Sequence, residues 1–151
     1  MKKQEVTTVK GLRAEQVVCN FLKMRGWKIV RHNWRPQLQG AGQVDILAEN
    51  PAESQAAVYL FEVKFRRNSV EDNFPLSSKQ LHRLYKAAYC WNQLYTKKLI
   101  RNLYLVLVEQ RNKYSQADVA NSRTVLCGVS GIKFFYTDYQ LSFFSFRAIL
   151  D

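Results

Sequence analysis

The fold of this chain is decided by two stretches of sequence, GQVDILA at residues 42–48 and VYLFEVK at residues 58–64. Both are mostly apolar and have the length of a strand, and a turn-forming segment separates them. A charged group inside a half-buried strand is costly unless it is paired or binds a cation. We therefore expect Asp45, Glu62 and Lys64 to lie together on neighbouring strands.

Side-chain alternation and hairpin geometry bring these charges together. Residues two apart on a strand share a face, so Glu62 and Lys64 project to the same side. A symmetric hairpin between the two strands places Asp45 opposite Glu62 and Leu47 opposite Leu60. Directly opposite side chains have Cβ atoms about 4.5–5.5 Å apart, a spacing that suits two carboxylates sharing one divalent cation.

This geometry predicts a metal site. Asp45 and Glu62 are the expected ligands of Mg²⁺ or Mn²⁺, and Lys64 would orient an attacking water or neutralise charge on a phosphate. Strict alternation keeps Val44 and Ile46 on the face opposite Asp45. The alternative interpretation is a solvent-facing salt bridge among the three charged side chains.

An amphipathic helix is predicted ahead of the strands. Residues 10–25 carry apolar side chains at helical spacing, and Gly26 closes the pattern. Glu15 stacks with Cys19 and Leu22 at the edge of the buried face, which makes it a candidate fourth member of the site. The alternative is an ordinary first-turn glutamate favoured by the helix dipole.

The remaining segments predict an α/β fold. Ser77 and Gln80 form a capping box ahead of a second helix. The expected strands are residues 27–34, 43–48, 57–65 and 103–109, followed by short aromatic-rich strands at 124–129, 132–136 and 141–146. The nearly continuous apolar run at 103–109 is typical of a central strand covered on both faces. We expect one domain over residues 1–151, with a helix-flanked mixed sheet in a core of about 10–110 and a β-rich extension of about 112–151.

Charge favours a polyanionic partner. The chain has 23 Lys and Arg against 12 Asp and Glu in 151 residues, a net charge of +11. Such an excess on a small folded domain favours nucleic acid before an anionic membrane. The side chains predicted to bind nucleic acid are Arg31, Trp34, Arg35, Arg66, Arg67, Lys79 and Arg83. A solvated basic face is the alternative for each.

Cysteine usage and hydropathy predict a cytoplasmic protein without a membrane partner. The three cysteines, Cys19, Cys90 and Cys127, include no C-x-x-C pair and are expected to be buried free thiols. Residues 1–8 lack the apolar segment of a signal peptide, and the longest apolar run is too short to span a bilayer. Two histidines are too few for a His-rich zinc site, and no nucleophile elbow occurs.

The ordered motifs resemble a known nuclease superfamily. An Asp in an apolar strand, followed after a turn by Glu-x-Lys, resembles the PD-(D/E)xK nucleases. The likeness narrows to the YraN-type family of small bacterial proteins, itself similar to archaeal Holliday-junction resolvases. It rests on GLRAE at 11–15, RHNWR at 31–35, GQVDILA at 42–48, FEVK at 61–64 with Arg66, and Lys79 at the start of the second helix.

The resemblance covers about residues 11–109 and carries expectations about fold and chemistry. It implies a restriction-endonuclease-like αβββαβ core that binds Mg²⁺ or Mn²⁺ and acts on DNA more than RNA. The implied catalytic set is Glu15, Asp45, Glu62 and Lys64.

The chain departs from the family pattern at several positions. The family usually has Glu where Gln43 stands, Gly where Ala14 stands and Thr where Phe65 stands. It often has Arg-Phe-Asp at the start of the last core strand, where this chain reads RNL at 101–103. Gln43 should point away from Asp45, so metal binding does not require Glu there.

Three functions are consistent with the sequence. The leading hypothesis is a metal-dependent endonuclease that hydrolyses phosphodiesters in DNA, including branched or flapped DNA. The second is a non-catalytic nucleic-acid-binding module with the same fold. The third is a protein-interaction domain whose aromatic C-terminal strands pair with a partner, or with a second copy in a homodimer.

Overall fold

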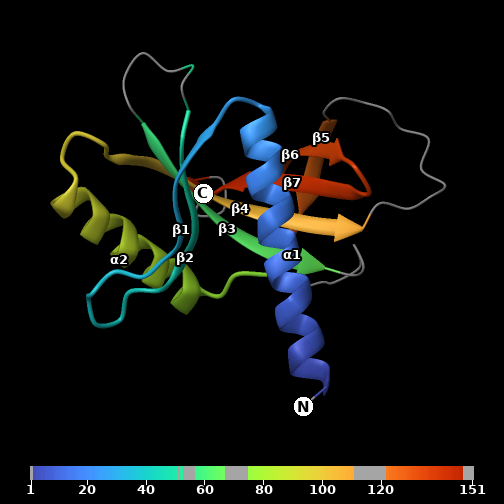
Figure 1. Cartoon of the computed structure of the whole chain (residues 1–151), viewed down its shortest axis with the longest axis horizontal. Helices are drawn as coiled ribbons and strands as arrows, with labels where there is room; N and C mark the ends of the chain where they lie inside the picture. The colour runs from blue at the N-terminus through green and yellow to red at the C-terminus, as the bar shows by residue number, and fades with distance from the viewer. Residues whose placement is uncertain (1, 51, 53–56, 67–74, 111–121, 148–151) are drawn as a thin grey trace.

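A seven-stranded sheet runs through the computed structural model, which describes residues 2–50, 52, 57–66, 75–110 and 122–147, with side chains from residue 11 onward. Its elements, in chain order, are α1 (Lys2–Met24), β1 (Lys28–Trp34), β2 (Val44–Glu49), β3 (Val58–Arg66), α2 (Ser78–Leu94), β4 (Ile100–Gln110), β5 (Ser122–Leu126), β6 (Val129–Tyr136) and β7 (Tyr139–Ser145). The strands lie in the order β1-β2-β3-β4-β7-β6-β5 (Figure 1). Among the described strands, β3 and β4 pair in parallel and the other pairs are antiparallel. The chain is therefore a mixed α/β protein, as its sequence predicts.

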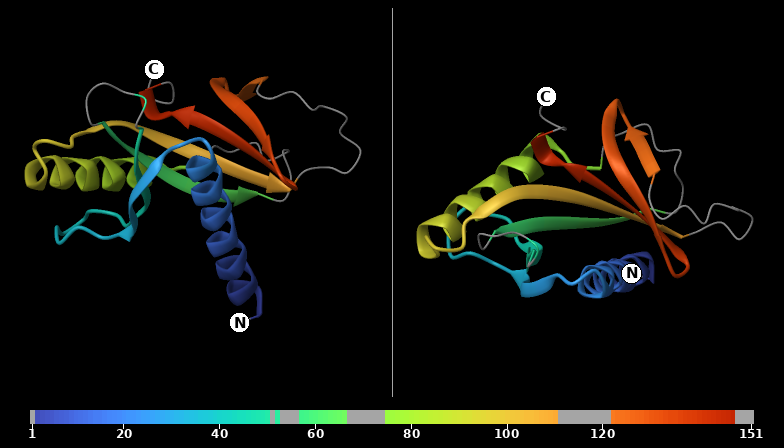
Figure 2. Two further views of the ribbon diagram at one scale, coloured as in Figure 1. Left: turned by 45° about the horizontal axis from the view of Figure 1, so that its top comes forward. Right: turned by 90° about the horizontal axis from the view of Figure 1, so that it is seen from above.

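The two helices cover opposite faces of the sheet (Figure 2). Helix α1 packs Val18 and Phe21 against a cluster that includes Phe61 of β3. Helix α2 packs Leu84 and Trp91 against the other cluster. The central strand β4 contributes alternate side chains to both clusters, which confirms the prediction of a strand covered on both faces.

Helix α1 ends in a Schellman motif. The Trp27 N–H donates to Leu22 O at 2.9 Å, and the Gly26 N–H donates to Lys23 O at 3.0 Å. Gly26 has φ +89°, the left-handed conformation that this motif needs and that glycine adopts without a steric penalty. The predicted helix is confirmed, although it begins earlier, at Lys2.

The capping box of α2 is also confirmed. The Ser77 hydroxyl accepts the Gln80 N–H at 3.2 Å, and Gln80 Oε1 accepts the Ser77 N–H at 2.9 Å. Two otherwise unsatisfied N–H groups at the start of the helix thus gain partners.

The pairing of β2 with β3 follows the predicted register from Glu49 back to Ile46, and the two strands separate before Ile46. Leu47 pairs with Leu60, as expected, but the last pair on this side is Ile46 with Phe61. Val44 packs in the α2-side core rather than with Ile46 in the α1-side core, so strict alternation fails at Asp45.

The side chains of β1 also change face, at the residue that pairs with Val44. Trp34 pairs with Val44, and both belong to the α2-side core. Asn33, just before Trp34, has φ +54°. This left-handed residue interrupts the extended backbone, so the ends of β1 and β2 turn together away from β3.

The C-terminal strands extend the same sheet, because β7 pairs with β4. Their predicted boundaries need correction: β5 and β6 are separated by a two-residue turn at Cys127 and Gly128, and Ser130 lies within β6. Both turn residues have positive φ, as tight hairpins favour. Cys127 is consequently exposed and Cys90 is only half-buried, so the prediction of three buried thiols holds for Cys19 alone.

Gly131 in β6 marks a close approach to β7. A Cβ atom at this position would lie 2.5 Å from Phe144 Cδ1 and 2.6 Å from Phe143 O. Phe144 is fully buried and the second atom belongs to the backbone, so neither can easily yield. We expect Gly131→Ala to lower the free energy of unfolding by about 1–3 kcal/mol in urea titrations. Gly128→Ala, where nothing lies near the added Cβ, tests backbone strain alone, and an equal loss in both variants would contradict the steric account.

Candidate functional site

Asp45 lies where strands β2 and β3 part. The backbone pairing of β2 with β3 stops at Ile46, the residue that follows Asp45 in the chain. The Asp45 Oδ2 atom accepts the Val63 N–H at 2.8 Å. A side-chain carboxylate therefore takes the place of a missing backbone acceptor. This bond fixes the carboxylate at the fork between the strands.

Glu15 approaches the fork from helix α1. Its side chain is close enough to Asp45 for a hydrogen bond between the two carboxyl groups. The Glu15 Oε2 atom also lies 3.3 Å from His32 Nε2. His32 pairs with Ile46 across β1 and β2, and Ile46 belongs to the α1-side core, which explains why His32 meets the helix.

Glu62 and Lys64 complete the cluster from strand β3. The Lys64 Nζ atom lies 3.6 Å from Glu62 Oε1, and the two side chains are 31% and 13% exposed, respectively. The second oxygen of Glu62 is buried without a donor when Asp45 is ionised, although the two carboxyl groups are close enough to share a proton. A buried carboxylate oxygen left in this state is costly, and a cation or a proton would relieve the cost.

The carboxyl groups hold protons more tightly than usual. Burial, followed by the charge of Asp45, raises the pKa of Glu62 to about 8 and that of Glu15 to about 7. Burial also raises the pKa of Asp45, although the Val63 N–H bond opposes the shift. Perturbed carboxyls gathered at one place are typical of functional sites and of structural ion-pair networks.

The structure thus brings together all four residues of the predicted catalytic set, Glu15, Asp45, Glu62 and Lys64. Within the described part of the chain, no three His, Cys, Asp or Glu side chains are already arranged to hold a metal ion. Two carboxylates with waters or phosphate oxygens are, however, a common environment for Mg²⁺. Asp45 and Glu62 fit that donor set, and the buried Glu62 oxygen that lacks a donor is the observation that supports the fit.

His32 is a member of the cluster whose contact with Glu15 was not predicted from the sequence. Its position follows from the β1–β2 register, which a single sequence does not reveal. Its place within the RHNWR stretch, between two predicted nucleic-acid contacts, was the available signal.

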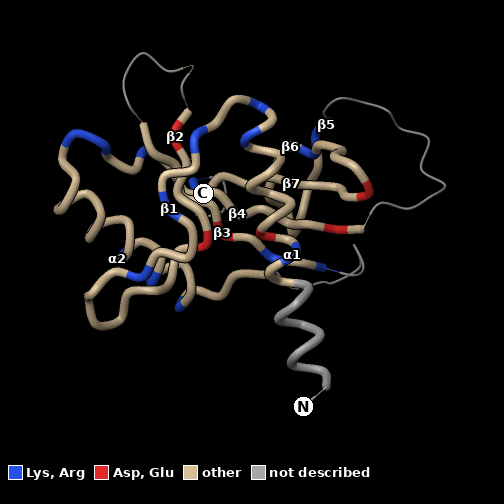
Figure 3. Tube along the Cα trace, in the orientation of Figure 1, with Lys and Arg blue, Asp and Glu red and all other residues tan. Residues whose placement is uncertain are grey.

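Some predicted nucleic-acid contacts gather near the fork. Arg35 is exposed and its Nη2 atom donates to Gln43 Oε1 at 3.4 Å. The neighbouring Gly42 N–H donates to Arg83 O at 3.2 Å, which fastens the β1–β2 loop to α2. Lys79 and Arg83 are exposed on that helix. Figure 3 shows Lys and Arg segments on α2 and on the loop between β1 and β2.

Other predicted contacts are placed differently. Arg66 is only 6% exposed and lies opposite Glu109 in the β3–β4 register, unlike the solvated phosphate contact expected from sequence. Arg67 lies outside the described residues. Arg31 places its guanidinium 5.8 Å from the ring centre of Trp91, and Trp34 packs edge-on against the same ring. Both side chains therefore have packing partners within the protein.

Fold and site define a mixed α/β protein with a carboxylate cluster at the fork of two strands. Residues 14–121 match the Uncharacterised protein family UPF0102, and the chain belongs to this family. This membership agrees with the YraN-type motifs in the sequence. In the described residues, no helix is both long and apolar enough to cross a membrane.

Several relatives carry the same family description. A UPF0102 protein of Campylobacter jejuni (strain 81-176) is 30% identical over 76 residues, covering 50% of this chain and 62% of its own length. One from Prochlorococcus marinus (strain MIT 9303) is 35% identical over 89 residues, or 56% and 64% of the two chains. One from Pelobacter propionicus is 26% identical over 117 residues, or 74% and 80%. The chain thus spans less than two thirds of the first two relatives.

Proposed function

We propose that this protein is a metal-dependent nuclease of the PD-(D/E)xK type, with a restriction-endonuclease-like core, that hydrolyses phosphodiester bonds in DNA. The observation that carries the proposal is the meeting of Asp45, Glu62 and Lys64 at one point of the sheet, with a buried carboxylate oxygen that lacks a donor. The element order α1-β1-β2-β3-α2-β4 is consistent with the core that the motifs imply.

Each member of the cluster has a chemical role in this proposal. Asp45 and Glu62 would hold Mg²⁺ or Mn²⁺, which acidifies water and polarises a phosphoryl oxygen. Lys64 would neutralise charge on the phosphate or orient the attacking water. Glu15, with His32 beside it, would assist by holding a proton against the Asp45 carboxylate.

The basic surface beside the fork supports a nucleic-acid substrate. Arg35, Lys79 and Arg83 are exposed around the loop that leads into Asp45, and the chain has a net charge of +11. Cations in this arrangement would bind the phosphates on either side of the scissile bond and release counterions. In this function the protein would act in the cytoplasm. Its substrate would be DNA, including branched or flapped forms.

A non-catalytic nucleic-acid-binding module is the second candidate. It is favoured by the observation that the described carboxylates do not already enclose a metal site. Such a module would bind DNA with an affinity that falls steeply with salt and does not change when Glu62 is replaced by alanine.

Metal-dependent cleavage of four-way junctions, flaps and linear duplexes tests the proposed activity. We expect the wild type to cleave at least one substrate with Mn²⁺ and Asp45→Asn to cleave it at least about a hundredfold more slowly, because the metal contributes several kcal/mol to the transition state. Asp138→Asn, in the exposed β6–β7 turn, is the matched control and should retain full activity. No cleavage of any substrate, together with no Mn²⁺ binding by calorimetry, would refute the nuclease.

A further inference from the structure

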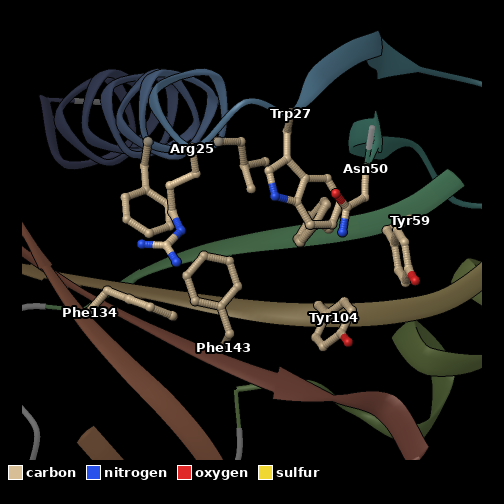
Figure 4. A pocket seen from close by; sticks show the side chains of 10 residues that line it. Arg25, Trp27, Asn50, Tyr59, Tyr104, Phe134 and Phe143 are labelled. Carbon is tan, nitrogen blue, oxygen red and sulfur yellow. The ribbon is translucent and has the colours of Figure 1, made fainter. Parts of the chain in front are cut away.

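A hollow lies on the α1 face of the sheet, and Phe61 of the FEVK motif forms part of its wall. It has a volume of about 400 Å³ and lies between the end of α1 and the inner strands (Figure 4). The side chains that the argument uses are Arg25, Trp27, Asn50, Phe61, Tyr104 and Phe134. This volume is within the range of small-ligand sites, which begins at about 300 Å³.

The walls of the hollow are aromatic rings in contrasting orientations. The Trp27 ring stands edge-on to Phe61, with centroids 5.6 Å apart. Phe61 is in turn nearly parallel to Tyr104, at 5.6 Å and 17°. The Schellman motif at Gly26 sets the direction in which Trp27 enters the hollow. Phe61 is nearly fully buried and holds the other two rings, so the half-buried Trp27 and Tyr104 are the rings that can contact a flat, unsaturated ligand.

Polar groups stand at two sides of the hollow. Arg25 holds its guanidinium 5.0 Å from the Phe134 ring centre, and Figure 4 shows it between α1 and the Phe134 and Phe143 side chains, at one end of the hollow. Asn50 stands on the other side, and its Oδ1 atom accepts the Ala52 N–H at 3.1 Å. That bond orients the Asn50 amide so that its NH₂ group can donate to a ligand.

Aromatic walls with polar groups at the rim favour some classes of ligand over others. A cage of rings alone would favour a cation, but the Arg25 guanidinium already occupies the rim and would repel one. A purely apolar ligand would make no use of the Arg25 guanidinium or of the Asn50 NH₂ group at the rim. A nucleobase can stack on the rings and accept from the amide, and an attached phosphate can pair with the guanidinium.

We propose that this hollow binds a nucleobase together with its adjacent phosphate. The ligand is either a free nucleotide or an unpaired nucleotide of a DNA strand, because both present the same chemistry. Arg25 follows Glu15 by ten residues along the chain, which is about 15 Å at the helical rise. A base held here would therefore be near the carboxylate cluster but outside it. Binding in this hollow would extend the proposed nuclease function, but it would not require that the protein cleaves DNA.

Fluorescence of 2-aminopurine tests the site, because this base is quenched when it stacks. The probes are 2-aminopurine riboside 5′-monophosphate, a duplex with a single bulged 2-aminopurine and the same duplex fully paired. Measurements are made in EDTA with wild type and Asp45→Asn, so the outcome is independent of cleavage. We expect quenching of the nucleotide, the bulged base or both, and little change in the paired duplex.

Matched charge variants decide whether the hollow is responsible. Arg25→Gln should raise the dissociation constant obtained from the quenching titration about tenfold, because the guanidinium pairs with the phosphate. Lys23→Gln removes another exposed cation, from the last turn of α1, and should change binding less than twofold. Quenching of the free nucleotide alone identifies a nucleotide site, and quenching of the bulge alone identifies a strand site. Absence of quenching, or equal losses in both variants, overturns the proposal even if the protein cleaves DNA.

Discussion

Raising the pH from 5 to 9 without divalent cations should destabilise the protein, and Glu62→Gln should remove a large part of this dependence. In the folded chain the pKa of Glu62 is raised from 4.5 to about 8 by burial and by Asp45. The folded state therefore binds the proton more tightly than the unfolded state. The resulting stabilisation is complete below about pH 4.5 and is lost as the pH rises through 8.

Glu15 should act in the same direction over a lower interval. Its pKa is raised to about 7, again by burial and by Asp45, so its contribution is lost between about 4.5 and 7. The difference in melting temperature between wild type and Glu62→Gln measures the Glu62 contribution together with the change that the substitution causes at Asp45. Glu49→Gln, which removes a β2 carboxylate paired with Lys98, is the matched control.

Mn²⁺ should reverse the loss of stability at high pH. If a cation takes the place of the protons, it binds best when the carboxyls are ionised, so it should raise the melting temperature more at pH 8.5 than at pH 5. Thermal unfolding with and without Mn²⁺ at both pH values measures this effect. Equal shifts at the two pH values, or unchanged shifts in Glu62→Gln, would contradict binding at Glu62.

The sequence predicts the sheet around the site because hydrophobic spacing and turn chemistry agree there. The pairing of Leu47 with Leu60 follows from a symmetric hairpin and is confirmed. The capping box of α2 and the glycine end of α1 are local signals, and both are confirmed. These features depend on neighbouring residues in the chain, which a single sequence contains.

The fork at Asp45 is not predictable in the same way. Alternation implies that Val44 and Ile46 share a face, but they pack in opposite cores. The change of face at Val44 coincides with the left-handed Asn33 across β1. Asp45 therefore bonds to the Val63 backbone instead of pairing directly with Glu62, a tertiary effect that periodicity does not encode.

The C-terminal strands show a second limit. Apart from Gly128, residues 124–129 suit a strand, so the apolar pattern alone does not mark the turn at Cys127. The turn is fixed by Gly128 and by the pairing of β5 with β6, while pairing of β7 with β4 fixes the place of the extension. These are long-range choices, and several arrangements would satisfy the same local pattern.

Trp91→Ala should produce the largest loss of stability, about 3–5 kcal/mol, or roughly 10 °C in melting temperature. Trp91 is 1% exposed, and its Nε1 atom donates to Lys98 O at 2.7 Å. Trp34 meets its ring edge-on at 5.3 Å, and the tilted Tyr95 ring packs against it at 4.1 Å. The substitution removes the side chain that joins α2 to the end of β1.

This loss should reach the carboxylate cluster as well as the core. Trp34 pairs with Val44, one residue before Asp45, so the Trp34–Trp91 contact supports the fork. We expect Trp34→Ala and Trp91→Ala to be non-additive in a double-mutant cycle, because each removes the same contact. Each should also weaken Mn²⁺ binding by calorimetry, whereas Trp91→Phe, which keeps a ring at this position, should weaken it less. Additive losses with unchanged Mn²⁺ affinity would show that the fork is held independently of α2.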